Sequence, residues 1–245
     1  MENQDGKKTI EVCFSPHSFP LYPHHESIVV VIDVLRATSS ICAALHYGVE
    51  RILPVASVHE ARNYQSKGFL CAAERQAQKV EGFDLGNSPS EYNNPKLKGK
   101  IIVFTTTNGT QAIRAAREAY RIVIGAFVNL TVLCEWLSHQ NKNIILLCAG
   151  WRDFFNLEDT LCAGAIAHTL DKTNLFETNY DSTLASKTLY EIAQKDLQGF
   201  MENSSHFKRL EKLNLSEDVK YCLSLDLAPV VPILEGNYLI PYKSK

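Results

Sequence analysis

IVVVIDVLRATS, residues 28–39, indicates the class of fold to which the chain belongs. Its first part, Ile28–Ile32, is a continuous β-branched run of the kind found in strands that are buried on both faces. Asp33 and Arg36 follow directly, and the Thr38–Ser39 pair is typical of the start of a helix. A buried strand that leads straight into a helix indicates a parallel sheet covered by helices.

Similar apolar runs recur along the chain, each followed by a segment with helical spacing. The predicted strands are 28–32, 52–55, 69–72, 100–104, 121–124 and 143–148, with late strands at 225–234 and 238–241. The predicted helices are 39–47, 57–67, 109–119, 129–140, 158–171, 182–196 and 204–213. The sequence therefore predicts a three-layer α/β/α fold with a mostly parallel or mixed central sheet.

The chain length suits a single domain of this type. At 245 residues one large core is sufficient, so we expect a single α/β domain over 1–245. A shift of 70 residues lays IDVLRATSS on IVFTTTNGT, and Arg51 on Arg121, which predicts a weak internal duplication. The apolar faces of the 39–47 and 129–140 helices suit either the core or a contact between subunits of a homo-oligomer.

Composition excludes several classes of partner. Lys and Arg number 25 against 27 Asp and Glu, so the net charge of -2 provides no field for nucleic acid or an anionic membrane. The polar start MENQDGKKT has no apolar signal region, and no run approaches the roughly 18–20 apolar residues of a membrane span, so we expect a cytoplasmic protein. Seven cysteines without a CxxC pair indicate reduced, packed thiols.

Polar residues that could carry chemistry collect where the predicted strands end. Asp33 and Arg36 come after the first strand, at the edge where open α/β sheets bind ligands. A plain alternative is that Arg36 only pairs with Asp33 while Thr38 caps the helix.

A second polar group follows the 100–104 strand, in the turn Thr105–Thr110. Its hydroxyl and amide side chains surround one glycine, Gly109, at the start of a predicted helix. Backbone N–H groups and the positive end of the helix dipole favour phosphate or carboxylate there. The plain alternative is a strand, a turn and an N-cap; the spacing of a nucleotide P-loop is absent.

A third group, Glu158 and Asp159, opens the helix after the 143–148 strand. The helix dipole alone favours acidic residues in a first turn. Their alternative role is to hold Mg²⁺, which prefers one or two carboxylates, waters and phosphate oxygens. Because parallel strands end at one edge, all three groups would meet in one cleft, an arrangement suited to phosphoryl transfer.

Two further candidates lie outside these turns. Arg75 lies at the start of the long irregular stretch 74–97, and loops of that length in compact domains are usually functional. His206 lies in a polar segment, where a lone histidine is more often a surface residue than a catalyst.

The motifs, taken in order, resemble those of the 2-phosphosulfolactate phosphatases. They are DVLRATS at 33–39, the ER pair at 74–75 before GNSP, TTTNGT at 105–110, CAG at 148–150, EDTLCAG at 158–164 and the SxH of Ser204–His206. The resemblance runs from about residue 10 to 235. It implies a three-layer α/β/α fold, a requirement for Mg²⁺ and hydrolysis of phosphate monoesters of 2-hydroxycarboxylic acids. In coenzyme M biosynthesis this reaction converts (2R)-phospho-3-sulfolactate to 3-sulfolactate.

The expected roles combine the residue patterns with this resemblance. We expect Asp33, with Glu158 or Asp159, to hold Mg²⁺, and Asp33, Asp159 and His206 to be catalytic. Arg36, Thr38, Arg75, Thr106, Thr107, Asn108 and Gly109 are expected to bind a small acidic phosphate ester. The nucleophile is either water or the carboxylate of Asp33.

Two other functions are compatible with the same residues. Cys148, with His168 or His206, could act as a thiol nucleophile for acyl transfer, although a buried core cysteine is the plainer interpretation. A phosphometabolite-binding module without turnover could use the same anion turn. Carboxylates beside that turn argue against such a module, because they repel an anionic ligand unless a metal intervenes.

Overall fold

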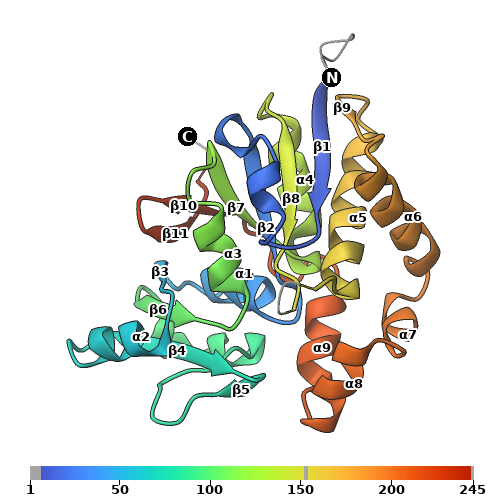
Figure 1. The fold of residues 1–245 in the computed structure, drawn as a ribbon. Helices are drawn as coiled ribbons and strands as arrows, with labels where there is room; N and C mark the ends of the chain where they lie inside the picture. The colour runs from blue at the N-terminus through green and yellow to red at the C-terminus, as the bar shows by residue number, and fades with distance from the viewer. Residues whose placement is uncertain (1–6, 152–153, 244–245) are drawn as a thin grey trace.

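The computed structural model describes residues 7–151 and 154–243. Within them, eleven strands form one sheet with helices packed around it (Figure 1). In chain order the strands are β1 (Lys8–Cys13), β2 (Ile28–Ile32), β3 (Arg51–Pro54), β4 (Leu70–Arg75), β5 (Gln78–Lys79), β6 (Ile101–Thr105), β7 (Arg121–Gly125), β8 (Ile144–Cys148), β9 (Phe176–Glu177), β10 (Pro232–Glu235) and β11 (Tyr238–Pro241).

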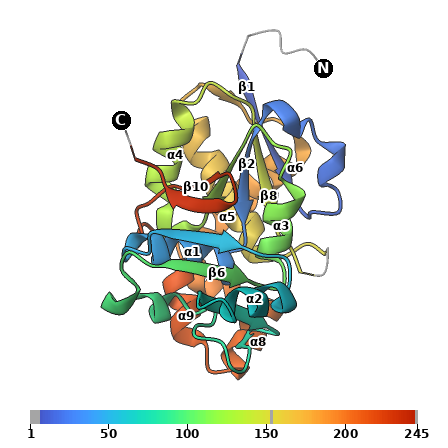
Figure 2. The same ribbon diagram turned by 90° about the vertical axis from the view of Figure 1, so that its left-hand side faces the viewer.

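The sheet consists of two parallel parts joined by an antiparallel hairpin. One part has the order β7-β2-β8-β1-β9, the other β4-β6-β3, and neighbours within each part run parallel. The short strand β5 extends the second part at its edge and pairs antiparallel with β4. The hairpin β10–β11 lies between the two parts, pairing antiparallel with β7 on one side and with β3 on the other. Figure 2 shows β3 and β6 running across the direction of β2 and β8, so the sheet turns sharply at the hairpin. The predicted mixed, mostly parallel sheet is confirmed.

Strand β2 lies in the middle of the larger parallel part. Its first residue, Ile28, aligns with Arg121 of β7 and Ile144 of β8, and its last, Ile32, aligns with Gly125 and Cys148. All five residues of β2 are buried, as the β-branched run predicts. Because the three strands end in register, the segments that follow them leave the sheet at one edge.

Nine helices occur in the described part of the chain. They are α1 (Ala37–His46), α2 (Val58–Gln65), α3 (Gly109–Ala115), α4 (Leu130–Ser138), α5 (Leu157–Asp171), α6 (Asp181–Ala193), α7 (Leu197–Met201), α8 (Ser205–Lys212) and α9 (Ser216–Leu223).

The helices cover both faces of the sheet, which gives the predicted three layers. Alternate residues of a strand point to opposite faces, so Val30 and Ile32 pack with α4 and α5, while Val29 and Val31 pack with α1 and α3. A third cluster lies under α2, against β3, β4 and β6. The apolar faces of α1 and α4 serve the core, one of the two roles that the sequence allows for them.

Several predicted elements need correction. The strand expected at 225–234 begins only at Pro232; Pro229 lacks the N–H that a ladder needs, and Asp226 has a φ of 56°. The helix expected at 109–119 ends at Ala115. The sequence analysis missed β5, β9 and α7, which have only two, two and five residues, and it also missed β1 and α9. The irregular stretch 74–97 contains the end of β4, β5 and two 3-10 turns, η3 (Pro89–Tyr92) and η4 (Pro95–Leu97).

The order of strands is symmetric about the hairpin, with β3 and β6 on one side and β7 and β2 on the other. The 70-residue shift relates β3 to β7 and the end of β2 to the start of β6. The symmetry agrees with a duplication, which itself stays a prediction.

Two further expectations concern the whole chain. All seven cysteines are free and buried, as expected for packed thiols. No helix in residues 7–151 and 154–243 has the length and apolar character needed to cross a membrane.

Candidate active site

The turn after β2 places Asp33 at the carboxyl edge of the sheet. The backbone N–H of Asp33 donates to Oγ1 of Thr38 at 3.1 Å, and Oγ of Ser39 donates to the carbonyl of Val34 at 2.9 Å. These local bonds fold the chain from strand to helix within four residues. Thr38 is fully buried, so the structure places it beneath the site, where it shapes the turn, and not on its surface.

The turn between β6 and α3 packs directly against the turn after β2. A Cβ added at Gly109 would lie 2.6 Å from Cβ of Ala37 and 2.9 Å from Oδ2 of Asp33. Only glycine allows this approach, which brings the two turns together. Thr106 is buried, and its Oγ1 accepts from the N–H of Thr110 at 3.3 Å, so it closes the turn from behind.

Glu74, at the end of β4, forms hydrogen bonds that connect β4 to the turn between β6 and α3. Its carboxylate accepts from the N–H of Ala77 at 2.6 Å and from the N–H of Thr107 at 3.2 Å. The Thr107 amide, which the sequence analysis assigned to an anion, is therefore occupied by a carboxylate. Arg75 donates to the carbonyl of Glu74 at 2.5 Å and to Oγ1 of Thr105 at 3.2 Å. Only the ER pair in the sequence pointed to Glu74, and no role was assigned to it.

Arg36 does not pair with Asp33. Its guanidinium forms a buried ion pair with Asp218 of α9, and its Nη2 donates to the carbonyl of Ala77 at 2.6 Å. The other carboxylate oxygen of Asp218 accepts from Oγ of Ser88 at 2.6 Å. Asp218 therefore ties the turn after β2 to the 74–97 segment, a role that no local pattern could reveal.

Glu158 and His206 form a second hydrogen-bonded pair at the same edge. Oε1 of Glu158 is bonded to Nδ1 of His206, and Nη2 of Arg209 lies 3.1 Å from Nε2 of His206. A guanidinium can only donate, so Nε2 accepts and Nδ1 carries the proton that it donates to Glu158. The guanidinium of Arg209 also lies over the ring of Trp151, 5.2 Å from its centroid.

Asp159 is completely buried beside this pair. Its Oδ1 accepts from the N–H of Val34 at 2.8 Å, and its Oδ2 accepts from the N–H of Gly150 at 3.2 Å and from Nδ2 of Asn156 at 2.9 Å. These three bonds connect the segments after β2 and β8 to the start of α5.

The residues at this edge surround a cleft of about 370 Å³. Of the predicted site residues, Asp33, Arg36, Arg75, Thr107, Asn108 and His206 line it, whereas Thr38, Thr106, Gly109 and Asp159 lie behind its wall. The sequence analysis missed Glu74, Ala77, Asn87, Trp151 and Arg209, which also line it. Arg209 lies three residues after His206 on α8, a spacing that could have indicated it.

A side cavity of about 360 Å³ adjoins the cleft. The two cavities share the side chains of Trp151, His206 and Arg209, and Glu158 lines only the side cavity. The predicted site residues thus gather around one composite space.

The electrostatics of the cleft are dominated by carboxylates. Burial, followed by the charges of Glu74 and Glu158, raises the pKa of Asp33 to about 7, although His206 acts in the opposite direction. Burial and the charges of Asp33 and Glu158 raise the pKa of Asp159 well above its ordinary value. Oε2 of Glu158 is buried without a hydrogen-bond partner among the described residues. Buried carboxylates that oppose one another, with an orphaned oxygen among them, are a donor set that fits a hard divalent cation.

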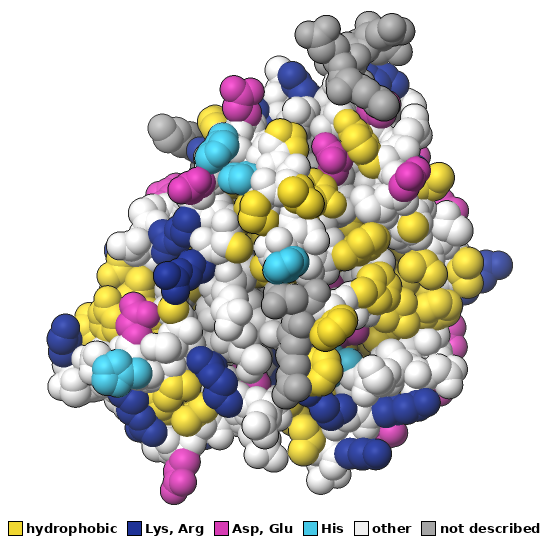
Figure 3. Space-filling view, viewed as in Figure 1, with side chains coloured by type: hydrophobic (Ala, Val, Ile, Leu, Met, Phe, Trp, Pro, Cys, Tyr) yellow, Lys and Arg dark blue, Asp and Glu magenta, His cyan; other side chains and the backbone are white. Residues whose placement is uncertain are grey.

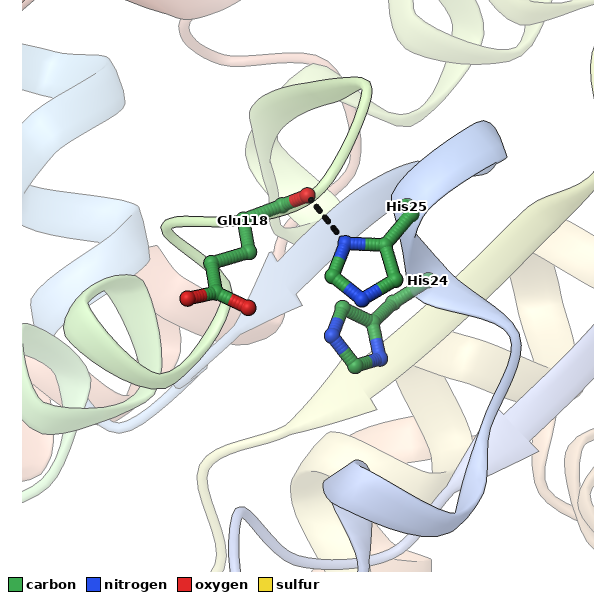
Figure 4. A group of neighbouring side chains, drawn as sticks. All are labelled: His24, His25 and Glu118. Atoms are coloured by element: carbon green, nitrogen blue, oxygen red, sulfur yellow. Dashed lines mark hydrogen bonds between the residues drawn. The ribbon is translucent and has the colours of Figure 1, made fainter.

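The carboxylates of the cleft do not lie close enough together to surround a cation completely. In the part of the chain that the structure describes, His24, His25 and Glu118 are the single group of three acidic, histidine or cysteine ligands with atoms within 4.8 Å of one another (Figure 4). That group lies before β2 and before β7, at the opposite end of these strands from Asp33. An open carboxylate set agrees with Mg²⁺, which keeps several waters and takes phosphate oxygens as ligands.

The thiol alternative has little structural support. Cys148 is fully buried, and burial raises the pKa of its thiol well above the ordinary value. His168 pairs with Glu191 of α6, and His206 pairs with Glu158. A nucleophilic cysteine needs a lowered pKa and access to solvent, and Cys148 has neither.

Fold and cleft together define a class of protein: an α/β protein with a cleft lined by arginines and carboxylates at the carboxyl edge of its sheet. Comparison with known sequences narrows this class. The profile of the family described as 2-phosphosulpholactate phosphatase matches residues 13–237. The chain therefore belongs to the 2-phosphosulfolactate phosphatase family, which is a family of phosphate-monoester hydrolases.

Individual relatives agree with this assignment, and each carries the name probable 2-phosphosulfolactate phosphatase. A protein of Caldanaerobacter subterraneus is 42% identical over 216 residues, covering 86% of this chain and 89% of the relative. A protein of Thermotoga petrophila is 41% identical over 221 residues, covering 90% and 95%. One from Clostridium botulinum is 35% identical over 221 residues, covering 88% and 92%.

Proposed function

We propose that this chain is a Mg²⁺-dependent phosphatase that hydrolyses 2-phosphosulfolactate, (2R)-phospho-3-sulfolactate, to 3-sulfolactate and phosphate, or a related phosphate monoester of a 2-hydroxycarboxylic acid. The single observation that supports this most is the meeting of Asp33 and Glu74 with Arg36, Arg75 and Asn108 in one cleft. Family membership gives the substrate class, because the relatives are named for this ester. Coenzyme M biosynthesis and a cytoplasmic location belong to the same proposal.

The chain's own groups have distinct proposed roles. Asp33, with the orphaned oxygen of Glu158, would hold Mg²⁺, and Glu74 adds a carboxylate that the sequence analysis had not assigned. Asp159, whose two oxygens already accept hydrogen bonds behind the wall of the cleft, would support the turn after β2. Bound to Asp33 and Glu158, Mg²⁺ would neutralise negative charge on the phosphate oxygens. Arg75 and Asn108 face the cleft and would bind those oxygens directly, while Arg36 is held in place by Asp218.

His206 is proposed to orient the attacking water, or to accept its proton, through Nε2, which carries no proton in this arrangement. It lines the cleft, and Glu158 holds its Nδ1–H, which fixes the ring orientation. Asp33 is proposed to act either as a nucleophile that forms an aspartyl phosphate or as a base that activates water. Trapping of labelled phosphate by rapid quench on wild type, but not on Asp33→Asn, would favour the aspartyl phosphate. Absence of label in both would favour water.

The substrate and the metal can be tested in one experiment. Phosphate release from phosphosulfolactate and 2-phospholactate is followed by ³¹P NMR with Mg²⁺ and with EDTA. We expect release that EDTA abolishes and Mg²⁺ restores. His24→Gln/His25→Gln serves as the matched control, because this variant removes the exposed ligand group at the other end of the sheet (Figure 4). Release that persists in EDTA, or a metal dependence that disappears in the control variant, would contradict the proposal.

A further inference from the structure

Arg209 differs from the other two arginines of the cleft in how its guanidinium is bonded. Arg36 is ion-paired with Asp218, and Arg75 donates to a carbonyl and a hydroxyl of its own neighbourhood. Across residues 7–151 and 154–243, no carboxylate forms an ion pair with Arg209. Its Nε is buried without a hydrogen-bond partner in the same set of residues. Arg209 therefore keeps a positive charge that no carboxylate of these residues neutralises.

The guanidinium is also held in a fixed orientation. The ring of Trp151 lies under it at 5.2 Å, and its Nη2 lies 3.1 Å from Nε2 of His206. A guanidinium that is stacked and anchored in this way loses little freedom when it binds an anion. Its planar fork matches the two oxygens of a carboxylate.

Arg209 lies where it can contact the carbon part of the ester, which leaves as the product alcohol, and not only the phosphate. Arg75 and Asn108 border the cleft only, whereas Arg209 borders both the cleft and the side cavity. Phe155 and Leu157 give the side cavity an apolar wall, and Ser204 and Ser205 add hydroxyls at the start of α8. Figure 3 shows that Lys and Arg side chains gather over α8 on this face of the molecule.

We propose that Arg209 is the specificity residue that binds the carboxylate attached to the phosphate-bearing carbon of the ester. The phosphate then occupies the cleft beside Asp33 and Asn108, and the remaining carbon chain enters the side cavity. This inference rests on the proposed function, because it assigns a part of the same substrate to a part of the same site.

A matched pair of esters isolates the carboxylate. In 2-phospholactate the phosphorylated carbon carries a carboxylate and a methyl group; in isopropyl phosphate a second methyl replaces the carboxylate. Hydrogen bonds to charged groups contribute enough that Arg209→Gln should lower kcat/KM for 2-phospholactate by roughly 10- to 100-fold. The same variant also removes the donor to Nε2 of His206, so kcat/KM for isopropyl phosphate should fall too, but at least about fivefold less, and Arg209→Lys should recover part of the loss. Lys208→Gln, on an exposed neighbour in α8, is the control.

Loss of activity on both esters to the same extent would overturn the inference, since it would mean that Arg209 supports the phosphate or the fold. An unchanged ratio between the two esters in every variant would also overturn it.

A binding experiment separates this inference from the proposed function. Trp136 and Trp151 are the two tryptophans, so Trp136→Phe leaves Trp151 as the single reporter in the site. Fluorescence titration should show that Arg209→Gln weakens binding of 2-phospholactate selectively. If wild type binds with this selectivity but releases no phosphate, the proposed function fails and the role of Arg209 stands. If it hydrolyses the ester but Arg209→Gln leaves both affinities unchanged, the role of Arg209 fails alone.

Discussion

The buried ion pair between Arg36 and Asp218 should be a major determinant of both stability and activity. Their side chains are only 4% and 9% exposed. Asp218→Ala would leave the charge of Arg36 buried and without its partner, and would also remove the acceptor for Ser88. Breaking a buried pair by removing one partner costs about 3–5 kcal/mol, because the remaining charge is uncompensated.

A matched surface pair provides the control. Arg51 and Glu50 form an ion pair whose side chains are 41% and 47% exposed. Exposed pairs contribute about 0–1 kcal/mol, so Glu50→Ala should change the free energy of unfolding very little. Urea unfolding followed by circular dichroism measures both variants under identical conditions.

For Asp218→Ala the expected loss corresponds to a Tm decrease of roughly 6–20 °C in a chain of this size. The double variant Arg36→Met/Asp218→Leu should recover much of the stability, since apolar residues can replace a buried pair, but it should not recover phosphatase activity. If Asp218→Ala and Glu50→Ala destabilise the protein equally, the reasoning about burial is refuted.

Three further predictions follow from the site. Gly109→Ala should destabilise the protein by about 1–3 kcal/mol and reduce activity, because the new Cβ would lie 2.6 Å from that of Ala37. Urea unfolding measures the loss of stability, and phosphate release measures the loss of activity. An unchanged midpoint of the urea unfolding transition would count against the close contact. The folded-state pKa of Asp33, about 7, lies above its unfolded value of 3.8, so the metal-free native state loses stability as pH rises through this window. In EDTA, Asp33→Asn should therefore be more stable than wild type at pH 8, by up to about 4 kcal/mol, and should lose this advantage near pH 4; equal stabilities at both pH values would contradict it. Cys148→Ala should keep phosphatase activity within about threefold, because a buried thiol with a raised pKa is not a nucleophile, and complete loss in a folded variant would reopen the thiol alternative.

The sequence predicted those parts of the fold and site that depend on local pattern. The run Ile28–Ile32 is buried throughout, as its β-branched composition requires, and the in-register ends of β2 and β8 bring Asp33 close to the start of α5. The polar turn before α3 meets Asp33 through Gly109. Each of these follows from strand ends gathering at one edge of a parallel sheet.

The remaining features depend on contacts between distant segments. Arg36 and Asp218 are 182 residues apart, and nothing in the local sequence around Asp218 relates it to the turn after β2. Thr38 and Thr106 are suitable residue types for binding a phosphate, but local hydrogen bonds use their hydroxyls below the surface. The spacing of Arg209 from His206 could have indicated it, but its proposed role depends on the ring of Trp151 and on both cavities.

The central claim is that the cleft around Asp33 hydrolyses a phosphate monoester. The most direct test compares phosphate release from phosphosulfolactate by wild type and by Asp33→Asn, both in Mg²⁺ and both with folded-state circular dichroism intact. The account predicts sustained release by wild type and a loss of at least about 100-fold in the variant. Equal rates in the two proteins, or no release by wild type from any 2-phospho acid, would contradict it.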